Sequence, residues 1–414
     1  MKLSEVLFQY TEDVKIQNIH QQHLEDEVFN LGQSGINRAL EILTAIVNQQ
    51  SDKVEIKLKW DGAPAIVFGE LPSDVGNYKK GTFFLGTKGV FSKDPTFATS
   101  REEISRVYGK SGEGLVNKLT DVFDYLRGIS PKGVFQGDLM WSRNSDKEKV
   151  KIDGKNCIVF QPNTIVYGIS REGDQDLYRI IDNSNIGIVI HTKYNGEDLA
   201  SMKPSYNVVM GRDYINNTDI WFGNPTVESG GAVSDEDTVK IKAIIDKIRS
   251  IKIDPKLFDV LQGLKPEQLI KTFINELLKK ENVVIGDVEA FIGKFVAWHT
   301  ARIEKEKGLL KKELAKQRRD ELLSGNLTAI NKYKSSFVKL LTVYKLIDDA
   351  KDVVVNAFDV AVGSKINVWL KEGDTFNTTS HEGYVAVMKK DNSINKLINR
   401  LKFSRANLMS GRFR

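Results

Sequence analysis

Lys59, Asp61 and Gly62 are the residues of this chain whose types and spacing most directly suggest chemistry. They close the run Lys53-Val54-Glu55-Ile56-Lys57-Leu58-Lys59-Trp60, in which charged and apolar side chains alternate with the period of a strand. The apolar face is expected to enter a core, and the charged face to present Lys59. A lysine amine at the polar end of a half-buried strand can act as a covalent nucleophile. The motif therefore indicates either a reactive amine or a solvated strand end.

Four further segments follow this motif along the chain, and their order carries more information than any one of them. Each combines strand-forming residues with a glycine, an acid, a cation or an aromatic side chain. They are Leu85–Gly89, Val134–Trp141 with Asp138, Asn163–Tyr167, and His381–Met388 followed by the basic stretch Lys396–Arg405.

In this order the segments resemble those of the covalent nucleotidyltransferases, which include ATP-dependent RNA and DNA ligases and mRNA capping enzymes. The likeness is nearest to phage-type RNA ligases, whose last signature strands resemble Glu382–Met388, and it covers about residues 53–200 and 380–405. In that family the lysine of KxDG attacks the α-phosphorus of a nucleoside triphosphate and holds the nucleotide as a phosphoramidate. The resemblance gives this role to Lys59 and implies a phage-encoded, ATP-dependent ligase that seals 5′-phosphate to 3′-hydroxyl ends of RNA or DNA.

The residue types meet the physical needs of such a reaction. A lysine attacks only as the free amine, and the adjacent cation Lys57 together with a bound divalent metal would favour that form. Mg²⁺ or Mn²⁺ bound through oxygen keeps several waters, so one or two carboxylates suffice. By resemblance these are Asp138 and Glu382, which are otherwise ordinary acids at strand ends. Asp61 and Gly62 are expected beside the nucleotide.

The resemblance also assigns side chains that would contact the nucleotide itself. Tyr167 is expected to stack on the purine, although a strand aromatic can equally be core, and Phe160 or Tyr194 could replace it. Thr87 and Lys88 would lie near the ribose or the phosphates.

A lysine near the end of the chain completes the expected set. Lys402 is the choice for the cation that meets the α- or γ-phosphate as pyrophosphate leaves, and Lys396 competes with it. His191 lies in an apolar strand and is expected to be structural.

Three departures from the family pattern narrow the resemblance. Gly62 is followed by Ala63-Pro64, where DNA ligases and capping enzymes usually have an arginine two positions on. Asp138 stands where a glutamate is commoner. Only 32 residues follow Glu382, which is too few for the β-barrel domain of those enzymes. An RNA-type ligase is thus favoured; a GTP-using capping-like enzyme, an enzyme with another acceptor and an inactive binding protein remain as alternatives.

Hydrophobic patterning predicts an α+β chain with a substantially antiparallel sheet. By resemblance, this is a nucleotidyltransferase core of the ATP-grasp-like ligase type with a large helical insertion. The predicted core spans residues 1–232, the helical insertion 233–362, and the closing strands with a basic tail 363–414. The predicted helices cover 24–49 with Ser34 as N-cap, 113–127, and 234–360 with breaks at 252–255, 263–266 and 325–326; strands occupy much of 53–222, then 366–370 and 383–388.

Charge is concentrated in two places, although the whole chain carries only +5 from 60 basic and 55 acidic side chains. Residues 389–414 hold eight basic residues against Asp391 alone. A polar helix over Arg302–Arg319 holds eight basic residues against three acidic ones. Both are expected to hold a polynucleotide by charge, unless the tail is simply solvated and the helix simply laced with ion pairs. A protein partner for the helical region is an alternative.

The single cysteine, Cys157, fits a reducing compartment and is expected to be buried in a strand. No apolar run reaches 18 residues, and the N-terminus lacks a signal-peptide pattern. The sequence therefore predicts a cytoplasmic protein without a membrane partner, in the host cytoplasm if it is phage-encoded.

Overall fold

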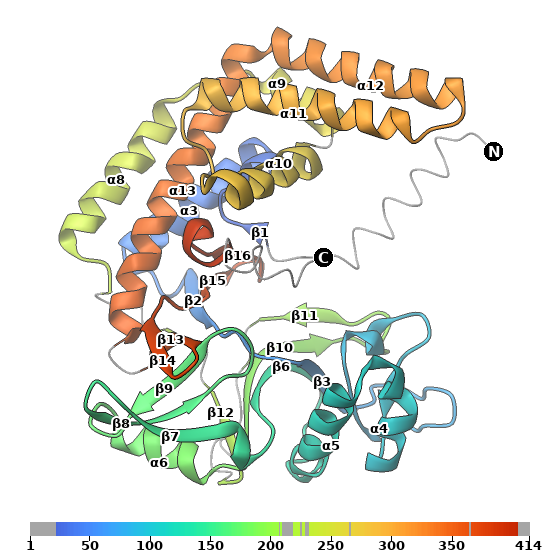
Figure 1. The fold of residues 1–414 in the computed structure, drawn as a ribbon, viewed down its shortest axis with the longest axis vertical. Coiled ribbons are helices and arrows are strands. Elements are labelled where there is room, and N and C mark those ends of the chain that lie inside the picture. Colours follow the sequence, from blue (N-terminus) through green and yellow to red (C-terminus); the bar gives the residue numbers. More distant parts are fainter. Residues whose placement is uncertain are drawn as a thin grey trace. The chain divides into compact units, whose positions relative to one another are not determined.

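The computed structural model describes residues 22–206, 208, 218–223, 226–227, 232–264, 266–363 and 366–404 (Figure 1). They form a mixed α+β protein, so the expected class is confirmed. The chain divides into two compact units. The sheet unit comprises Ala45–Val239 and Val353–Ser393, and the helical unit comprises Met1–Thr44, Lys240–Asp352 and Ile394–Arg414.

The strands and helices alternate over the first half of the chain, and long helices dominate afterwards. The strands are β1 (Gln22–His23), β2 (Val54–Lys59), β3 (Ala65–Glu70), β4 (Phe83–Gly86), β5 (Phe97–Ala98), β6 (Val134–Trp141), β7 (Lys147–Ile152), β8 (Lys155–Phe160), β9 (Val166–Ser170), β10 (Ile186–Asn195), β11 (Lys203–Ser205), β12 (Ile220–Phe222), β13 (Asn367–Glu372), β14 (Thr375–Thr378), β15 (Gly383–Met388) and β16 (Ile394–Leu397). The α-helices are α2 (Glu27–Leu31), α3 (Gln33–Val47), α4 (Arg101–Tyr108), α5 (Glu113–Gly128), α6 (Gln175–Asn183), α8 (Asp235–Ser250), α9 (Pro255–Leu264), α10 (Pro266–Glu281), α11 (Val288–Gly308), α12 (Glu313–Lys332) and α13 (Lys334–Gly363).

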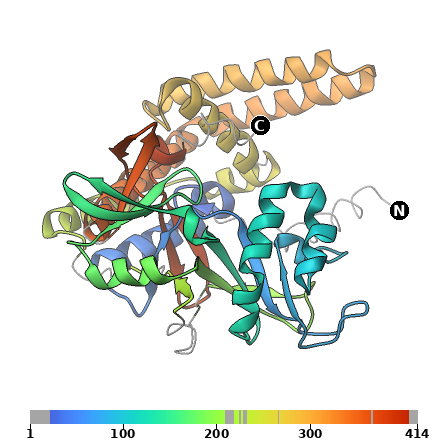
Figure 2. The same ribbon diagram turned by 60° about the horizontal axis from the view of Figure 1, so that its bottom comes forward.

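The largest sheet of the sheet unit has the strand order β11-β10-β6-β3-β4-β5, with β12 beside β10. Every pair along that order is antiparallel, and only β12 runs parallel to its neighbour. Buried apolar side chains on one face, such as Ile66, Phe68 and Leu139, pack against α4 and α5. Figure 2 shows these two helices beside the strands. This side of the sheet is therefore a closed core.

A second sheet of the same unit has the order β14-β13-β9-β8-β7 and is antiparallel throughout. Cys157 is buried in β8, as expected. One face of β8 carries Phe160, whose ring lies 4.7 Å from Trp141 and 5.8 Å from Tyr167. These rings form the apolar core beneath the candidate site.

The motif strand β2 pairs antiparallel with β15, which returns late in the chain. Val54, Ile56 and Leu58 are buried, as their alternation predicts. β15 is buried along its whole length, which explains why Gly383–Met388 reads as a nearly continuous apolar run.

The predicted helix over 24–49 is two helices. Gly32 ends α2 with a φ of +58°, a backbone conformation that glycine adopts without the strain of a side chain. Ser34, expected as an N-cap, lies inside α3.

The predicted helical region over 234–360 is confirmed by α8 to α13, and so is the break near 252–255. The break predicted at 263–266 falls on residue 265, which lies outside the described residues. The break at Gly325-Asn326 is wrong, because α12 runs through both residues and Asn326 is buried and contacts His299 at 3.0 Å. Tertiary packing here outweighs the low helix propensity of glycine.

The polar helix expected over Arg302–Arg319 is instead the end of α11, a turn and the start of α12. Its charges pair with one another: Lys307 Nζ lies 2.6 Å from Asp320, and Arg319 Nε lies 3.3 Å from Glu306. Ion pairs, which were the expected alternative to polynucleotide contact, therefore account for Lys307 and Arg319.

The borders of the two units fall near the expected ones, at 239/240 and 352/353 instead of 232/233 and 362/363. The assignment of the chain ends differs, because residues 22–44 and 394–404 group with the helices. The expected change of character spans residues 228–232, of which 228–231 lie outside the described residues and 232 is described. Over the described part of the chain, no helix combines the length and apolarity needed to span a bilayer.

Candidate functional site

Lys59 lies at the end of β2, opposite Gly383 of β15. This register brings the residue before β15, Glu382, next to the lysine. Lys59 Nζ is 2.5 Å from Glu382 Oε2, and the two side chains are 25% and 11% exposed. The lysine is thus partly open to solvent, whereas Glu382 Oε2 is buried beneath it, and the strand ladder fixes the backbone of both residues.

Lys57 has a place different from the expected one. Its side chain is buried, and its Nζ donates a hydrogen bond to the Tyr206 carbonyl at 2.5 Å and lies 3.5 Å from Glu55. Burial lowers the pKa of Lys57. Because this amine is committed to protein partners, Lys57 supports the strand and is not available to a nucleotide.

Asp61 is a buried carboxylate that fixes the loop after β2. It accepts hydrogen bonds from Asn163 Nδ2 at 2.7 Å and from the Thr164 and Ile165 amides at 2.9 and 3.4 Å. The motif aspartate therefore ties the end of β2 to the turn between β8 and β9. Its oxygens act within the protein, where a nucleotide contact had been expected.

Tyr167 is fully buried, which excludes the expected stacking on a purine. Its hydroxyl accepts a hydrogen bond from the Asp61 amide at 2.7 Å, and its ring lies 4.9 Å from Trp60. Burial raises the pKa of Tyr167; the Asp61 amide opposes this, and the charges of Asp61, Glu382 and Asp138 add to it. The hydrogen bond from the Asp61 amide makes Tyr167 a residue that positions the motif loop.

The two aromatic alternatives to Tyr167 are also engaged elsewhere. Phe160 is buried in the core. The Tyr194 hydroxyl donates to Gln136 Oε1 at 2.6 Å, and its ring lies 4.3 Å from Phe91.

Gly62 is required by the close approach of β6. A Cβ built at this position would lie 2.5 Å from Asp138 Cβ, closer than real Cβ atoms approach, and 3.1 Å from the Leu139 carbonyl oxygen, which is a tight contact. The loop is held further by the Ala63 amide, which donates to Leu139 O at 3.0 Å, and by Lys118 Nζ, which donates to Ala63 O at 2.8 Å. The glycine therefore brings the motif loop against Asp138.

Asp138 lies in β6, between Ala65 of β3 and Val189 of β10. Its side chain is 21% exposed. It can therefore accept a ligand from solvent at the same edge of the sheet as the motif loop.

His191 is a site residue that sequence reasoning missed. It lies at an irregularity in the β10–β6 ladder, between Ile190 and Thr192, and such bulges redirect side chains. Its Nε2 is 3.7 Å from Asp138 Oδ1, and its Nδ1 is 2.7 Å from Thr192 Oγ1. The sequence held one signal, a polar residue within an apolar strand.

Thr87 and Lys88 follow the end of β4 and approach the same edge of the sheet. Gly86 pairs with Val67, two residues from Ala65, which itself pairs with Asp138. The Thr87 amide donates to the Tyr108 hydroxyl at 3.3 Å, and Lys88 is exposed at the start of a short 3₁₀ helix. Register thus brings both residues toward Asp138.

The two closing lysines belong to the helical unit. Lys396 lies in β16 and pairs with His23 of β1, whereas Lys402 is exposed in the π-helix Arg400–Ser404.

One cation of the expected basic tail, Arg400, is buried in the core. Arg400 is buried and donates to the Tyr344 hydroxyl at 2.9 Å and to Asn275 Oδ1 at 2.7 Å. It cannot hold a polynucleotide, because its guanidinium anchors the closing segment. Arg405, Arg412 and Arg414 lie outside the described residues.

The oxygen donors of this site, Asp138 and Glu382, are of the type that binds Mg²⁺ or Mn²⁺. The described residues contain no group of three or more histidine, cysteine or acidic side chains arranged around a metal position. Asp138 is half-buried and Glu382 is buried, and the charges of both raise the pKa of Tyr167. Two carboxylates suit Mg²⁺ or Mn²⁺, which retain water ligands.

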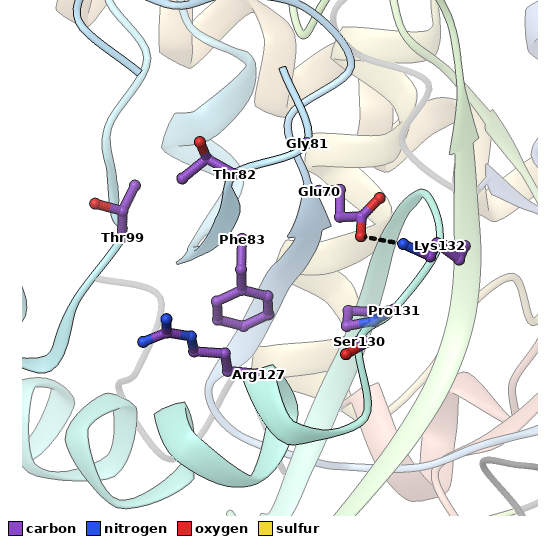
Figure 3. Close-up of a pocket in the computed structure, with 9 residues that line it drawn as sticks. All are labelled: Glu70, Gly81, Thr82, Phe83, Thr99, Arg127, Ser130, Pro131 and Lys132. Carbon is purple, nitrogen blue, oxygen red and sulfur yellow. Dashed lines mark hydrogen bonds and ion pairs between the residues drawn. The ribbon is translucent and has the colours of Figure 1, made fainter. Parts of the chain in front are cut away.

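A cavity of about 390 Å³ lies at the other end of β3 (Figure 3). It is lined in part by Glu70, Phe83 and Arg127, and Lys132 Nζ lies 2.7 Å from Glu70 Oε1 at its wall. It contains none of the site residues expected from the sequence, and Glu70 is the last residue of β3, whereas Ala65 is the first.

A search of curated proteins and a search of solved structures each found no match. A family model, described as a family of unknown function, matches residues 18–412. The chain therefore belongs to this family, DUF6267.

Proposed function

We propose that the protein is an ATP-dependent polynucleotide ligase of the RNA-ligase type that carries AMP on Lys59. The observation that supports this most is the contact of Lys59 Nζ with Glu382 at 2.5 Å, made by two motifs that lie far apart in the sequence. A nucleophilic amine needs a neighbouring group that takes its proton, and this carboxylate is in reach.

The first step would form a bond between Lys59 Nζ and the α-phosphorus of ATP. Glu382 accepts a proton from Nζ, and the nitrogen lone pair attacks the phosphorus. The bond from the α-phosphorus to its bridging oxygen breaks, and pyrophosphate leaves with that electron pair. Positioning contributes most to such a transfer, because the ladder fixes both residues before the substrate arrives.

Two transfers would follow. An oxygen of a 5′-phosphate end attacks the phosphorus, the P–N bond breaks, and its electron pair returns to Lys59 Nζ, which takes up a proton. A 3′-hydroxyl then attacks the activated 5′-phosphate and releases AMP, which seals the strand.

Asp138 and Glu382 would hold the divalent metal, which neutralises the triphosphate charge when bound. Gly62 allows the motif loop to approach Asp138, and Asp61 with Tyr167 holds that loop in place. Thr87 and Lys88 would meet the ribose or the phosphates. In this proposal the sheet unit is a ligase-type nucleotidyltransferase core.

Covalent labelling tests the proposal. The protein is incubated with α-³²P-labelled ATP and Mg²⁺ or Mn²⁺, denatured and resolved by electrophoresis. We expect an acid-labile adduct on the wild-type protein and on Lys53→Ala, an exposed lysine next to the same strand, and none on Lys59→Ala.

An adduct that survives Lys59→Ala, or no adduct with any nucleoside triphosphate, would overturn the proposal. Labelling by GTP alone would indicate a capping-like enzyme. Labelling without joining of RNA or DNA ends would indicate another acceptor.

A further inference from the structure

A second basic region of the sheet unit lies away from Lys59, in a groove of about 680 Å³ beside the second sheet. Its cations come from three elements: Lys149 and Lys151 from β7, Arg171 after β9, and Arg179 from α6. We infer that this groove binds the phosphodiester backbone of a single polynucleotide strand, as a contact for the substrate of the proposed ligase. The inference rests on that proposed function for its substrate class.

The strand register aligns the polar side chains of the groove. Lys151 pairs with Asn156 of β8, and the Arg171 amide donates to the Asn156 carbonyl at 2.8 Å. Residues directly opposite one another on antiparallel strands point to the same face, so a cation, an amide and a cation form a row about 10 Å across. Lys149 lies two residues from Lys151, about 7 Å along the same face. The cations therefore form a surface rather than a single point.

The ion pairs of the groove leave a surplus of positive charge. Lys149 Nζ lies 2.8 Å from Asp182, and Arg179 lies 3.0 Å from Asp176. Among the described residues no ion pair within 4 Å involves Lys151 or Arg171, and both are exposed. Glu172 accepts hydrogen bonds from the Asn156 amides at 3.0 to 3.3 Å and lies next to Arg171, so the groove also holds one acid outside these pairs. Its four cations still outnumber the three acids Asp176, Asp182 and Glu172.

An aromatic ring accompanies the cations. Tyr178 of α6 lines the same groove and is half-buried, which fixes the ring while leaving part of it open. Basic grooves with aromatic platforms bind single strands, because every base can stack on a ring. An acidic peptide would use the cations but has no need of the ring.

The groove and the motif loop lie at opposite ends of β8. Asn156 is near its start, and the turn after its last residue, Phe160, carries Asn163 and Thr164, which hold Asp61. A strand of this length spans roughly 17 Å. A strand of nucleic acid whose end reaches Lys59 could therefore also reach the groove a few nucleotides away.

The test measures binding separately from chemistry. A fluorescein-labelled ten-nucleotide oligouridylate without a 5′-phosphate is titrated with the full-length protein at several salt concentrations, and fluorescence anisotropy gives Kd. For Lys151→Glu with Arg171→Glu we expect about tenfold weaker binding and a salt slope smaller by about 1.4, which corresponds to two lost phosphate contacts. Labelling of Lys59 by ATP should be unchanged.

Matched variants separate the groove from general charge. Lys80→Glu with Lys110→Glu changes two exposed lysines of the same unit that do not line the groove, and should leave Kd within about twofold at moderate salt. Tyr178→Leu should weaken binding about tenfold, and Tyr178→Phe should restore it.

Equal weakening by both charge-reversed pairs, or unchanged binding by the groove pair, would overturn the inference. The inference would also be overturned if the wild-type protein bound a fluorescent polyglutamate and the groove pair lost that binding while its binding of oligouridylate was unchanged. That result would identify an acidic-peptide site. Normal groove binding with no labelling of Lys59 by any nucleotide would overturn the proposed ligase activity and leave the groove as a polynucleotide site.

Discussion

Two lysine–glutamate pairs with similar distances lie in the two units of this protein. Lys59 and Glu382 meet at 2.5 Å in the sheet unit, and Lys351 and Glu25 meet at 2.9 Å in the helical unit. The first pair is 25% and 11% exposed, and the second is fully buried. Distance alone does not distinguish a reactive lysine from a structural one.

Their surroundings explain the difference. Lys351 also lies 2.5 Å from Asp348, and burial opposes its charge while Glu25 and Asp348 raise its pKa. That lysine stays protonated and has no path to a substrate. Lys59 lies at a strand end and has one short contact with an acid, Glu382. Its side chain is partly exposed, so a substrate can reach it. Exposure and the number of acidic partners therefore leave Lys59, and not Lys351, available for the proposed reaction.

The largest expected effect is on the chemistry of Lys59. Lys59→Arg keeps a cation opposite Glu382 but has no amine that forms the phosphoramidate. We expect nucleotide labelling to fall at least about a thousandfold, with an unchanged unfolding midpoint in urea. If Lys59→Arg were labelled within tenfold of the wild-type protein, Lys59 would not be the nucleophile and would have a structural role like that of Lys351.

The next effect is on stability, at the buried pair. Lys351→Met leaves Glu25 and Asp348 without their cation, so that Glu25 either stays charged in the core or binds a proton there, and should lower the free energy of unfolding by about 3 to 5 kcal/mol. Urea denaturation followed by circular dichroism measures this. Lys345→Met, on the same helix and paired with Asp349 at 38% exposure, should cost less than about 1 kcal/mol. Equal losses for the two variants would contradict the distinction between them.

The buried pair also predicts a pH dependence. Burial raises the pKa of Glu25 from 4.5 to about 7, with Lys351 opposing and Asp348 and Asp26 adding to the shift. Between these pH values the folded protein keeps a proton that the unfolded chain loses, so this contribution is complete below pH 4.5 and is lost as pH rises to 7. Its upper bound is roughly 3 kcal/mol.

Glu25→Gln removes this titration. Relative to the variant, the wild-type protein should lose stability between pH 4.5 and 7, as followed by urea unfolding across that range. Parallel curves for the two proteins would show that Glu25 titrates normally.

The smallest expected effect concerns the loop that follows Lys59 and holds Asp61 and Gly62. Tyr167→Phe removes the acceptor of the Asp61 amide without changing the ring, and should cost about 1 to 2 kcal/mol of unfolding free energy. Nucleotide labelling should slow without being abolished. A complete loss of labelling in a folded variant would instead give Tyr167 a direct part in the reaction.

Local patterns predicted much of this molecule correctly. The alternation over Lys53–Trp60 predicted β2, and the apolar periodicity over 234–360 predicted the helical region, because both depend on neighbours within a few residues. The patterns were wrong where distant contacts decide. Gly325-Asn326 stays helical because Asn326 packs against His299, and Tyr167 is core because Trp60 and Phe160 cover it.

The sequence by itself determined the strand that ends at Lys59, the acids and glycines that follow it, and the α+β class, since each is set by local period or residue type. Only the tertiary structure decided that Glu382 faces Lys59, that Lys57 and Arg400 are buried, and that His191 reaches Asp138. Strand register and burial assign these partners. Both depend on how distant segments pack, which a single sequence does not record.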